Sequence, residues 1–271
     1  MHERFVQAGG LRTRYLEEGE GPPVLLLHGA SLGSSCDVWA DTLAPLAAFG
    51  LRVIAFDQPG FGESDNPDDA SVGFRTRFVP LFMDALRIDT AAIVGHSQSG
   101  RIAVNLATKE PRRVSRIIVV GTASLLPPLG DKADAGDAEE ENAAEPTLEE
   151  TRQLVVSQLF DAAAATPERI ALRQRMSTGK NFEAFLARRR AKAADKGGKS
   201  GPAPWQKLPE VAVPMRLIYG KQDRSADERS RLALHHNPQL DLHLVDRCKH
   251  LVMWDAPEEF CALAETFLRK D

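Results

Sequence analysis

Short apolar runs alternate with stretches of apolar residues at helical spacing along the first 121 residues. The runs VLLLH (24–28) and LRVIAFD (51–57) are almost continuously apolar, which is typical of strands buried on both faces of a sheet. Segments 4–9 and 11–18 alternate instead around a Gly-Gly turn, and they predict a hairpin. The further elements predicted here are helices at 38–49, 76–87 and 99–109 and strands at 91–96 and 116–121.

This rhythm stops after Gly121 and resumes near Met215. Alternating strands and helices with buried strands predict an α/β protein with a mostly parallel sheet and right-handed crossovers. We therefore expect one core domain, residues 1–124 and 206–271, with residues 125–205 inserted after the sixth strand. The elements predicted in the returning segment are strands at 215–220 and 240–245 and helices at 226–235 and 257–269.

The inserted segment is strongly polarised in charge. Residues 131–150 hold nine acids and one lysine, whereas residues 180–200 hold seven bases and two acids. The acidic stretch is either a solvated loop with little to bury or a partner of the arginine run at 188–190. Exposed pairs of that kind are typically worth under ~1 kcal/mol each. Apolar positions at 148–160 and 170–186 recur at helical spacing and predict two or three amphipathic helices.

Charge, apolar segments and cysteine spacing argue against several classes of function. The 271 residues carry a formal net charge of -4 and a sequence pI near 6.0, so we expect no nucleic-acid partner. The N-terminus lacks the apolar core of a signal peptide, and no apolar stretch approaches the ~20 residues of a membrane span. A cytoplasmic protein without a membrane partner is expected. Cys36, Cys248 and Cys261 are widely spaced and predict reduced thiols, with neither a disulfide framework nor a zinc site.

The segment from Gly95 to Arg101 is the most informative for chemistry. A buried strand runs directly into a helix with Ser97 at the corner, and in such a nucleophile elbow the positions two before and two after the serine must be small. These are Gly95 and Ser99, so the second glycine of G-x-S-x-G is replaced. Two other interpretations stay open. Ser97 could be a helix N-cap, or the segment a phosphate-binding loop in which Arg101 and Ile102 replace the usual Lys and Ser/Thr.

A nucleophilic serine needs a base to take its proton, and the base needs a third group to fix its tautomer. In a sheet of this kind, functional groups follow the carboxyl ends of the strands. Asp223 follows the strand at 215–220, and His250 follows the strand at 240–245. The order Ser97, Asp223, His250 is that of an α/β-hydrolase triad. We expect Ser97 to attack, His250 to relay protons and Asp223 to orient His250.

The developing oxyanion needs two backbone donors aimed at it in advance. We expect one at the amide of Gln98, directly after the serine, and the other at Ala30, with Ser31 as the fallback. His28 is expected to hold that loop by hydrogen bonds and not to act as a base. The histidines outside these motifs are expected to be solvent-facing or structural: His2, His235, His236 and His243.

Together these motifs resemble the α/β-hydrolase superfamily: His28-Gly29, the run DQPGFGES at 57–64, the Ser97 elbow, the G-x-x-D that ends at Asp223, and His250. The resemblance implies an α/β-hydrolase fold, with a mostly parallel eight-stranded sheet flanked by helices. It also implies that the insert is a helical cap, or lid, over the active site. Haloalkane dehalogenases and many epoxide hydrolases carry aspartate at the elbow, so Ser97 argues against both.

Within the superfamily, PGFGESD at 59–65, the run at 83–89 and the segment from His250 onward resemble the meta-cleavage-product hydrolases. That resemblance implies C–C bond cleavage in a 2-hydroxy-6-oxodienoate, by proton relocation on the dienol and then attack on the ketone. The chain departs from the family at His96 in place of Asn, at Leu251 in place of Trp, and in the loop 29–33, where Gly-Pro-Gly is lost. The candidates for the family's lid arginine are Arg173, Arg175 and the run at 188–190.

The sequence thus predicts a serine hydrolase that needs neither a cofactor nor a metal. Our first expectation is cleavage of a carboxylic ester of a small organic substrate through an acyl-enzyme at Ser97. The alternative is a C–C bond hydrolase, and a further one is a non-catalytic binding or receptor protein on the same fold. The expected partner is a small-molecule carbonyl substrate, and a homo-oligomer is left open. The residues expected to line the pocket are Ser31, His96, Leu251 and Trp254.

Overall fold

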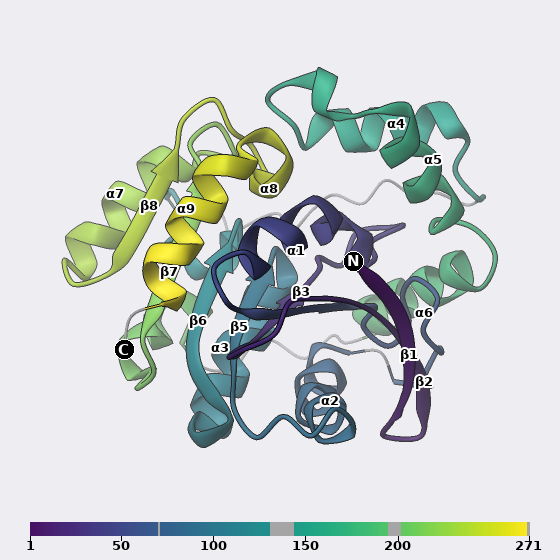
Figure 1. Cartoon of the computed structure of the whole chain (residues 1–271). Coiled ribbons are helices and arrows are strands. Elements are labelled where there is room, and N and C mark those ends of the chain that lie inside the picture. Colours follow the sequence, from purple (N-terminus) through teal and green to yellow (C-terminus); the bar gives the residue numbers. More distant parts are fainter. Residues whose placement is uncertain (70, 131–143, 195–201, 270–271) are drawn as a thin grey trace.

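The computed structural model describes residues 1–269 apart from residue 70 and the segments 131–143 and 195–201 (Figure 1). Eight strands form one sheet in the order β1-β2-β4-β3-β5-β6-β7-β8. β2 runs antiparallel to both neighbours, and all pairs from β4–β3 to β7–β8 are parallel. The strands are β1 (His2–Ala8), β2 (Leu11–Glu18), β3 (Pro23–Leu27), β4 (Arg52–Phe56), β5 (Ala91–His96), β6 (Val114–Val120), β7 (Met215–Gly220) and β8 (Asp241–Val245).

The predicted fold class and the N-terminal hairpin are both confirmed by this sheet. Helices cover both of its faces, as the alternation of strands and helices required. The helices are α1 (Ala40–Ala47), α2 (Val72–Ala85), α3 (Gln98–Lys109), α4 (Leu148–Ser157), α5 (Pro167–Arg175), α6 (Lys180–Ala194), α7 (Ala226–His236), α8 (Val252–Asp255) and α9 (Pro257–Leu268). α2 begins earlier than predicted because the Ser71 hydroxyl caps it, accepting a hydrogen bond from the amide of Phe74.

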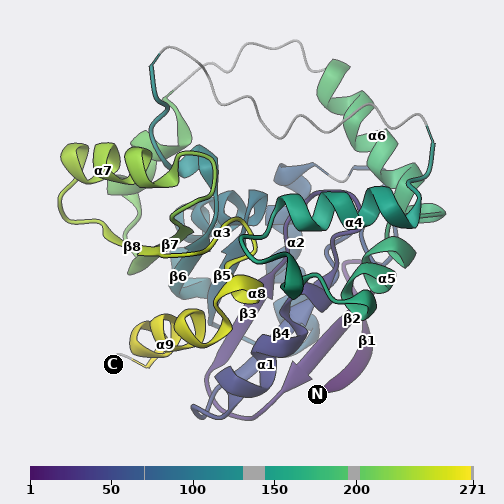
Figure 2. The same ribbon diagram turned by 90° about the horizontal axis from the view of Figure 1, so that it is seen from above.

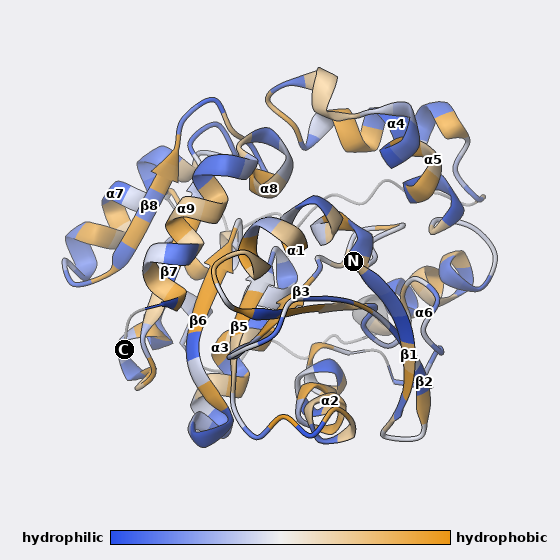
Figure 3. Ribbon diagram, viewed as in Figure 1, coloured by the Kyte–Doolittle hydropathy of each residue, from blue (hydrophilic) through white to orange (hydrophobic). Residues whose placement is uncertain are grey.

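Successive residues of the central strands pack into two hydrophobic cores, one on each face of the sheet. In β3, Val24 and Leu26 join the core covered by α1 and α9, whereas Leu25 and Leu27 join the core covered by α2, α3 and α7. Figure 3 shows much of β5 and β6 in the apolar colour. Burial of one such side chain contributes about 1.5–3 kcal/mol. The two cores therefore hold the central strands rigidly beneath the loops at their carboxyl ends.

The described residues between β6 and β7 form three α-helices within the proposed cap at 125–205: α4, α5 and α6. The predicted helical range 170–186 is divided, because the chain turns at Gly179, where φ is +55°. α4 starts with a capping box between Thr147 and Glu150. Figures 1 and 2 show α4 and α5 above the edge at which the parallel strands end. Phe182 and Phe185 of α6 pack on Leu32, in the loop after β3.

The charge pattern of the insert is only partly visible. Most of the acidic stretch lies outside the described residues, so its pairing with the arginine run at 188–190 stays a prediction. The Arg188 guanidinium donates to the carbonyl of Gly60 at 2.7 Å and lies over the Phe61 ring. Across the described residues, none of the helices has the length and apolar character that crossing a membrane would require.

Candidate active site

Ser97 occupies the corner between β5 and α3 with a strained backbone. Its φ of +54° is unusual for a residue with a Cβ, and such strain persists only where the surroundings impose it. The Ser97 amide donates to the carbonyl of Val120 at 2.7 Å, and the Thr122 hydroxyl donates to the Ser97 carbonyl at 2.5 Å. The Ser97 side chain makes no capping hydrogen bond to α3. The local geometry is that of an elbow and not of an ordinary N-cap.

The elbow is closed by two glycines that tolerate no side chain. A Cβ on Gly95 would lie 2.3 Å from the carbonyl oxygen of Ser99, and a Cβ on Gly100 would lie 2.1 Å from the hydroxyl of Thr122. Position 99 has room for a serine, which is fully buried. Its hydroxyl donates to the carbonyl of His28 at 2.5 Å. The departure from G-x-S-x-G therefore adds a hydrogen bond between the elbow and the residue that follows β3.

Asp223 and His250 meet as the sequence predicts. His250 Nδ1 donates to Asp223 Oδ2 at 2.8 Å, and each side chain is 9% exposed. Burial alone would raise the pKa of Asp223, but the hydrogen bond from His250 and the charges of His250 and Arg224 lower it below its usual range. Arg224, which the sequence did not single out, donates to Asp223 Oδ1 at 3.1 Å and lies against the His250 ring. Asp223 stays charged and holds His250 in place.

Gly121, the residue after β6, lies close to both Ser97 and His250. A Cβ on Gly121 would lie 3.2 Å from His250 Nδ1, and the preceding residue, Val120, binds the Ser97 amide. The described hydrogen bonds do not include one from the Ser97 hydroxyl to His250. Nucleophile–base hydrogen bonds often tighten only when substrate is bound. The structure therefore brings the three side chains to one edge of the sheet.

The loop after β3 is fixed by His28. Burial lowers the pKa of His28 to about 3, so the ring is neutral. Its Nδ1 donates to the Gly29 carbonyl at 2.7 Å, and its Nε2 accepts from the Gln58 amide at 3.0 Å. The predicted structural role of His28 is confirmed. A Cβ on Gly29 would lie 3.2 Å from the Ser97 Cβ, so the next residue, Ala30, follows directly where the chain passes the elbow.

Ser31 lies in the loop after β3, and His96, the last residue of β5, contacts His250. The Ser31 hydroxyl accepts a hydrogen bond from Arg173 at 2.6 Å. His96 Nε2 donates to the His250 carbonyl at 3.0 Å, while its buried Nδ1 has no partner among the described residues. Burial lowers the pKa of His96 well below its usual value, so the ring is neutral. His96 thus supports the backbone of His250.

The other two residues expected at the pocket lie deeper. Leu251 is 2% exposed and belongs to the core covered by α1 and α9. The Trp254 indole donates to the carbonyl of Val38 at 2.9 Å, and the guanidinium of Arg169, from the cap, stacks over its ring. These contacts join the core to the proposed cap. A direct role of Leu251 and Trp254 in lining the pocket stays a prediction.

Among the candidate lid arginines, Arg173 differs from the others in its burial and in its lack of a carboxylate partner among the described residues. Arg173 is 8% exposed, has no carboxylate partner among the described residues, and leaves its buried Nε unbonded. Burial lowers its pKa to about 10. Arg175, on the same helix, is 64% exposed and lies 3.8 Å from Glu63. The sequence could not choose between these residues, because the choice depends on which face of α5 meets the loop after β3.

The proposed cap is tied to the His250 loop through Asp255. Its carboxylate accepts two backbone hydrogen bonds. One comes at 2.9 Å from the amide of Phe160, in the segment after α4, and the other at 2.8 Å from the amide of Lys249. The carbonyl of Gln158 also accepts a hydrogen bond from the amide of His250 itself, at 3.0 Å. The position of the proposed base therefore depends on the cap.

Replacing Asp255 with asparagine should lower the free energy of unfolding by about 1–2 kcal/mol, because backbone donors lose a charged acceptor. We also expect a several-fold loss of kcat, since the His250 loop loosens. Urea unfolding and steady-state kinetics measure both effects. Glu258→Gln, an exposed acid at the start of α9, is the matched control. An unchanged unfolding free energy in Asp255→Asn would contradict the tie.

Among the residues that the structure describes, one largely buried group of acids and a thiol has ligand atoms close enough together for a metal: Cys36, Asp37 and Asp57. The sequence did not foresee this group. The Arg14 guanidinium lies among all three, at 2.8 Å from Asp37 and 3.3 Å from Asp57. The cation that these acids require is therefore supplied by the chain. Cys36, Cys248 and Cys261 are all buried free thiols.

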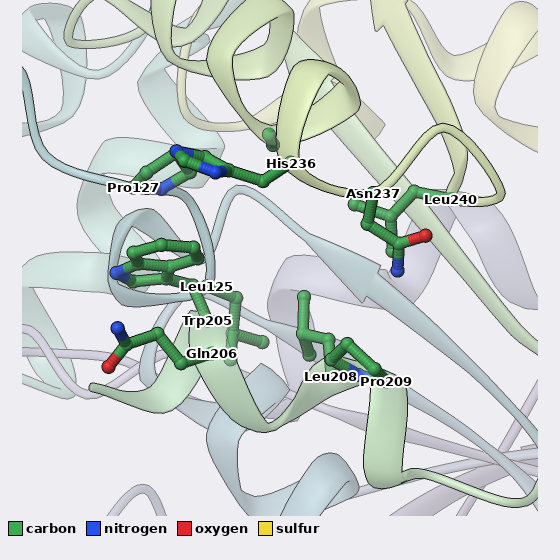
Figure 4. Close-up of a pocket in the computed structure, with 10 residues that line it drawn as sticks. Leu125, Pro127, Trp205, Gln206, Leu208, Pro209, His236, Asn237 and Leu240 are labelled. Carbon is green, nitrogen blue, oxygen red and sulfur yellow. The ribbon is translucent and has the colours of Figure 1, made fainter. Parts of the chain in front are cut away.

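A cavity of about 200 Å³ lies where the proposed cap joins the core (Figure 4). Leu125 and Pro127 line it from the segment leaving the core, and Trp205 and Leu208 line it from the segment that returns. The Trp205 ring lies 5.2 Å from the ring of His236. None of the three triad side chains lines this cavity, so it is separate from the candidate active site.

Comparison with known proteins agrees with this geometry. The model of the Alpha/beta hydrolase family matches residues 24–263. The 2-hydroxy-6-oxononadienedioate/2-hydroxy-6-oxononatrienedioate hydrolase of Burkholderia vietnamiensis is 30% identical, over 96% of this chain and 92% of that protein. The 2-hydroxymuconate semialdehyde hydrolase of a Pseudomonas species is 30% identical, over 98% and 93%. A solved meta-cleavage product hydrolase from Pseudomonas fluorescens superposes with a TM-score of 0.79 at 28% identity, over 97% and 96%.

Fold, elbow and relatives define the class of this protein, which is a hydrolase. The chain belongs to the α/β-hydrolase family, and its relatives include meta-cleavage-product hydrolases. The predicted family resemblance and the prediction of an enzyme are confirmed. The serine hydrolase is supported as well, whereas these relatives give no support to the ester substrate that we expected first.

Proposed function

We propose that this chain hydrolyses a carbon–carbon bond in a 2-hydroxy-6-oxodienoate, the alternative raised by the sequence, in preference to a carboxylic ester. The observation that carries the proposal is the buried Arg173, which has no carboxylate partner among the described residues. A buried charge is costly unless something pairs with it. The carboxylate of a dienoate would pair with Arg173, whereas a simple ester leaves it uncompensated. The names of the relatives point to the same class of substrate.

In the proposed complex, the substrate carboxylate binds Arg173, which donates to Ser31 in the loop that carries Ala30. The ketone carbonyl then faces Ser97, with its oxygen at the amides of Ala30 and Gln98. The proton of the 2-hydroxyl first moves to C5, which converts C2 into a ketone. The electrons of the C5–C6 bond can then flow through C4 and C3 to the oxygen on C2, so this bond becomes cleavable.

His250 takes the proton of Ser97 as the serine oxygen bonds to C6, and the two amides stabilise the resulting oxyanion. Collapse of the tetrahedral intermediate breaks the C5–C6 bond and leaves an acyl group on Ser97. The dienolate takes up the proton from His250 and departs as a 2-hydroxydienoate. A water molecule, deprotonated by His250, then hydrolyses the acyl-enzyme to a carboxylic acid and restores Ser97. Asp223 orients His250 throughout.

The decisive assay compares 2-hydroxy-6-oxo-6-phenylhexa-2,4-dienoate with short p-nitrophenyl esters on the purified protein. We expect kcat/KM for the dienoate to exceed that for the esters by at least about 100-fold, because a site built around a buried charge rejects substrates that leave it unpaired. If kcat/KM were instead about 100-fold higher for the esters, the first expectation, an ester hydrolase, would be correct. Turnover of neither substrate would contradict both.

A further inference from the structure

A second buried arginine lies close to the elbow and has no part in the proposed reaction. Arg75, in α2, is 2% exposed, and no carboxylate pairs with it among the described residues. Its Nε is buried without a partner. Burial and the charges of Arg188 and Arg101 lower its pKa to about 9, so the group is still charged at pH 7. A buried charge without a counter-charge is destabilising. The hydrogen bonds of Arg75 indicate the role for which it is kept.

The two ends of the guanidinium hold different glutamines. One nitrogen, Nη2, donates to the side-chain carbonyl of Gln98, the residue whose amide is one proposed oxyanion donor. The other, Nη1, lies 3.4 Å from the side-chain carbonyl of Gln58. The planar fork of arginine fixes the direction of both bonds at once. Arg75 therefore connects the start of α3 with the loop after β4.

Gln58 carries that connection to the other side of the proposed oxyanion hole. Its side-chain amide donates to the carbonyl of His28 at 2.7 Å and to the hydroxyl of Ser99 at 3.0 Å. The Ser99 hydroxyl donates to the same His28 carbonyl. Gln58, His28 and Ser99 are each at most 1% exposed. The strand end that leads into Ala30 is thus bonded, through Gln58, to the guanidinium that holds Gln98.

We propose that Arg75 is a positioning residue for the oxyanion hole, joining the two backbone donors, at Gln98 and Ala30, through its fork to the side chains of Gln98 and Gln58. The proposal rests on the oxyanion hole of the proposed function. Donors of an oxyanion hole must be held 2.7–3.1 Å from the oxygen of the transition state. A link that spans both donors restricts their separation. The uncompensated positive charge also favours negative charge nearby in a water-poor site.

Two variants distinguish the effect of the Arg75 charge from the effect of its two-pronged hydrogen bonding. Arg75→Met removes both, whereas Arg75→Lys keeps the charge but cannot donate to both glutamines in the same geometry. Arg77→Met is the matched control, because Arg77 lies on the same helix with its side chain 66% exposed. Each variant is assayed with 2-hydroxy-6-oxo-6-phenylhexa-2,4-dienoate and with p-nitrophenyl acetate. Rates are expressed per site titrated with a fluorophosphonate, so that unfolded protein does not count.

We expect Arg75→Met to lower kcat about 10- to 100-fold on both substrates, less than the ~10²–10³ that a direct oxyanion donor contributes. KM should stay within about threefold, because the link acts on the transition state and not on substrate binding. The affinity for phenyl trifluoromethyl ketone, whose adduct with the serine carries the oxyanion, should fall by the same factor as kcat. Arg75→Lys should lose only about three- to tenfold, and Arg77→Met should match the wild type.

Unchanged kcat and inhibitor affinity in Arg75→Met, with Ser97→Ala inactive, would overturn the role of Arg75 and leave the proposed function standing. A rise in KM at constant kcat would overturn it too, because Arg75 would then bind substrate. If Arg75→Met does not fold, Arg75→Lys decides, and wild-type kcat and inhibitor affinity in that variant overturn the proposal. Activity retained by Ser97→Ala would instead remove the proposed function and this inference together.

Discussion

Replacing Ser97 with alanine should lower kcat by at least about 10⁴-fold, while KM stays within a few-fold of the wild-type value. The Ser97 hydroxyl oxygen forms the bond to the substrate carbon, and the hydroxyl of nearby Ser99 is already bonded to the carbonyl of His28. Alanine keeps the Cβ and the contacts of the Ser97 backbone with Val120 and Thr122. The fold should therefore survive, and the loss should be confined to the chemical step.

The measurement joins steady-state kinetics with the intact mass of the protein after treatment with a fluorophosphonate. Wild-type protein should gain one adduct, and Ser97→Ala should gain none. Ser115→Ala, at an exposed position on β6, is the control and should label like the wild type. Retention of more than about 1% of kcat in Ser97→Ala would disprove the covalent mechanism, because loss of the nucleophile of a triad costs far more.

The fold could be predicted because its signals are local. Runs such as 24–27 and 91–94 are continuously apolar. The structure shows why, since successive residues of β3 enter different cores. The elbow was equally readable, because the tight turn restricts Gly95 and neighbouring positions whatever the rest of the chain does. Asp223 and His250 were found from their places after two strands. Parallel strands bring such positions together at one edge of the sheet.

The charged residues around the site could not be predicted, because their roles depend on contacts between distant segments. Arg75 resembles any arginine of an amphipathic helix, and only the packing of α2 against α3 places it at Gln98. Ser99 was recognised as small, but its hydrogen bond to His28 spans 71 positions of sequence. The division of 170–186 into two helices has a local cause in Gly179. By contrast, the choice of which face of α5 points inward has no local cause in the sequence.

Arg173→Gln should lower kcat/KM for the dienoate about 150- to 5000-fold, because breaking one buried charge pair costs about 3–5 kcal/mol. For p-nitrophenyl acetate, which carries no carboxylate, kcat/KM should stay within about threefold. Arg173 lies on α5, within the proposed cap, and its contact with Ser31 is separate from the contacts among Ser97, His250 and Asp223. The variant should therefore change the selectivity between substrates and leave the acyl transfer intact.

The same substitution should raise the stability of the free protein. Arg173 has no carboxylate partner among the described residues, so in the free enzyme its buried charge is uncompensated. A neutral glutamine avoids that desolvation, and we expect the unfolding free energy to rise by about 1 kcal/mol. Arg175→Gln, at an exposed position of α5, is the matched control and should change neither property. Equal losses on both substrates, or a lower stability, would mean that Arg173 holds the fold of the cap and does not recognise a carboxylate.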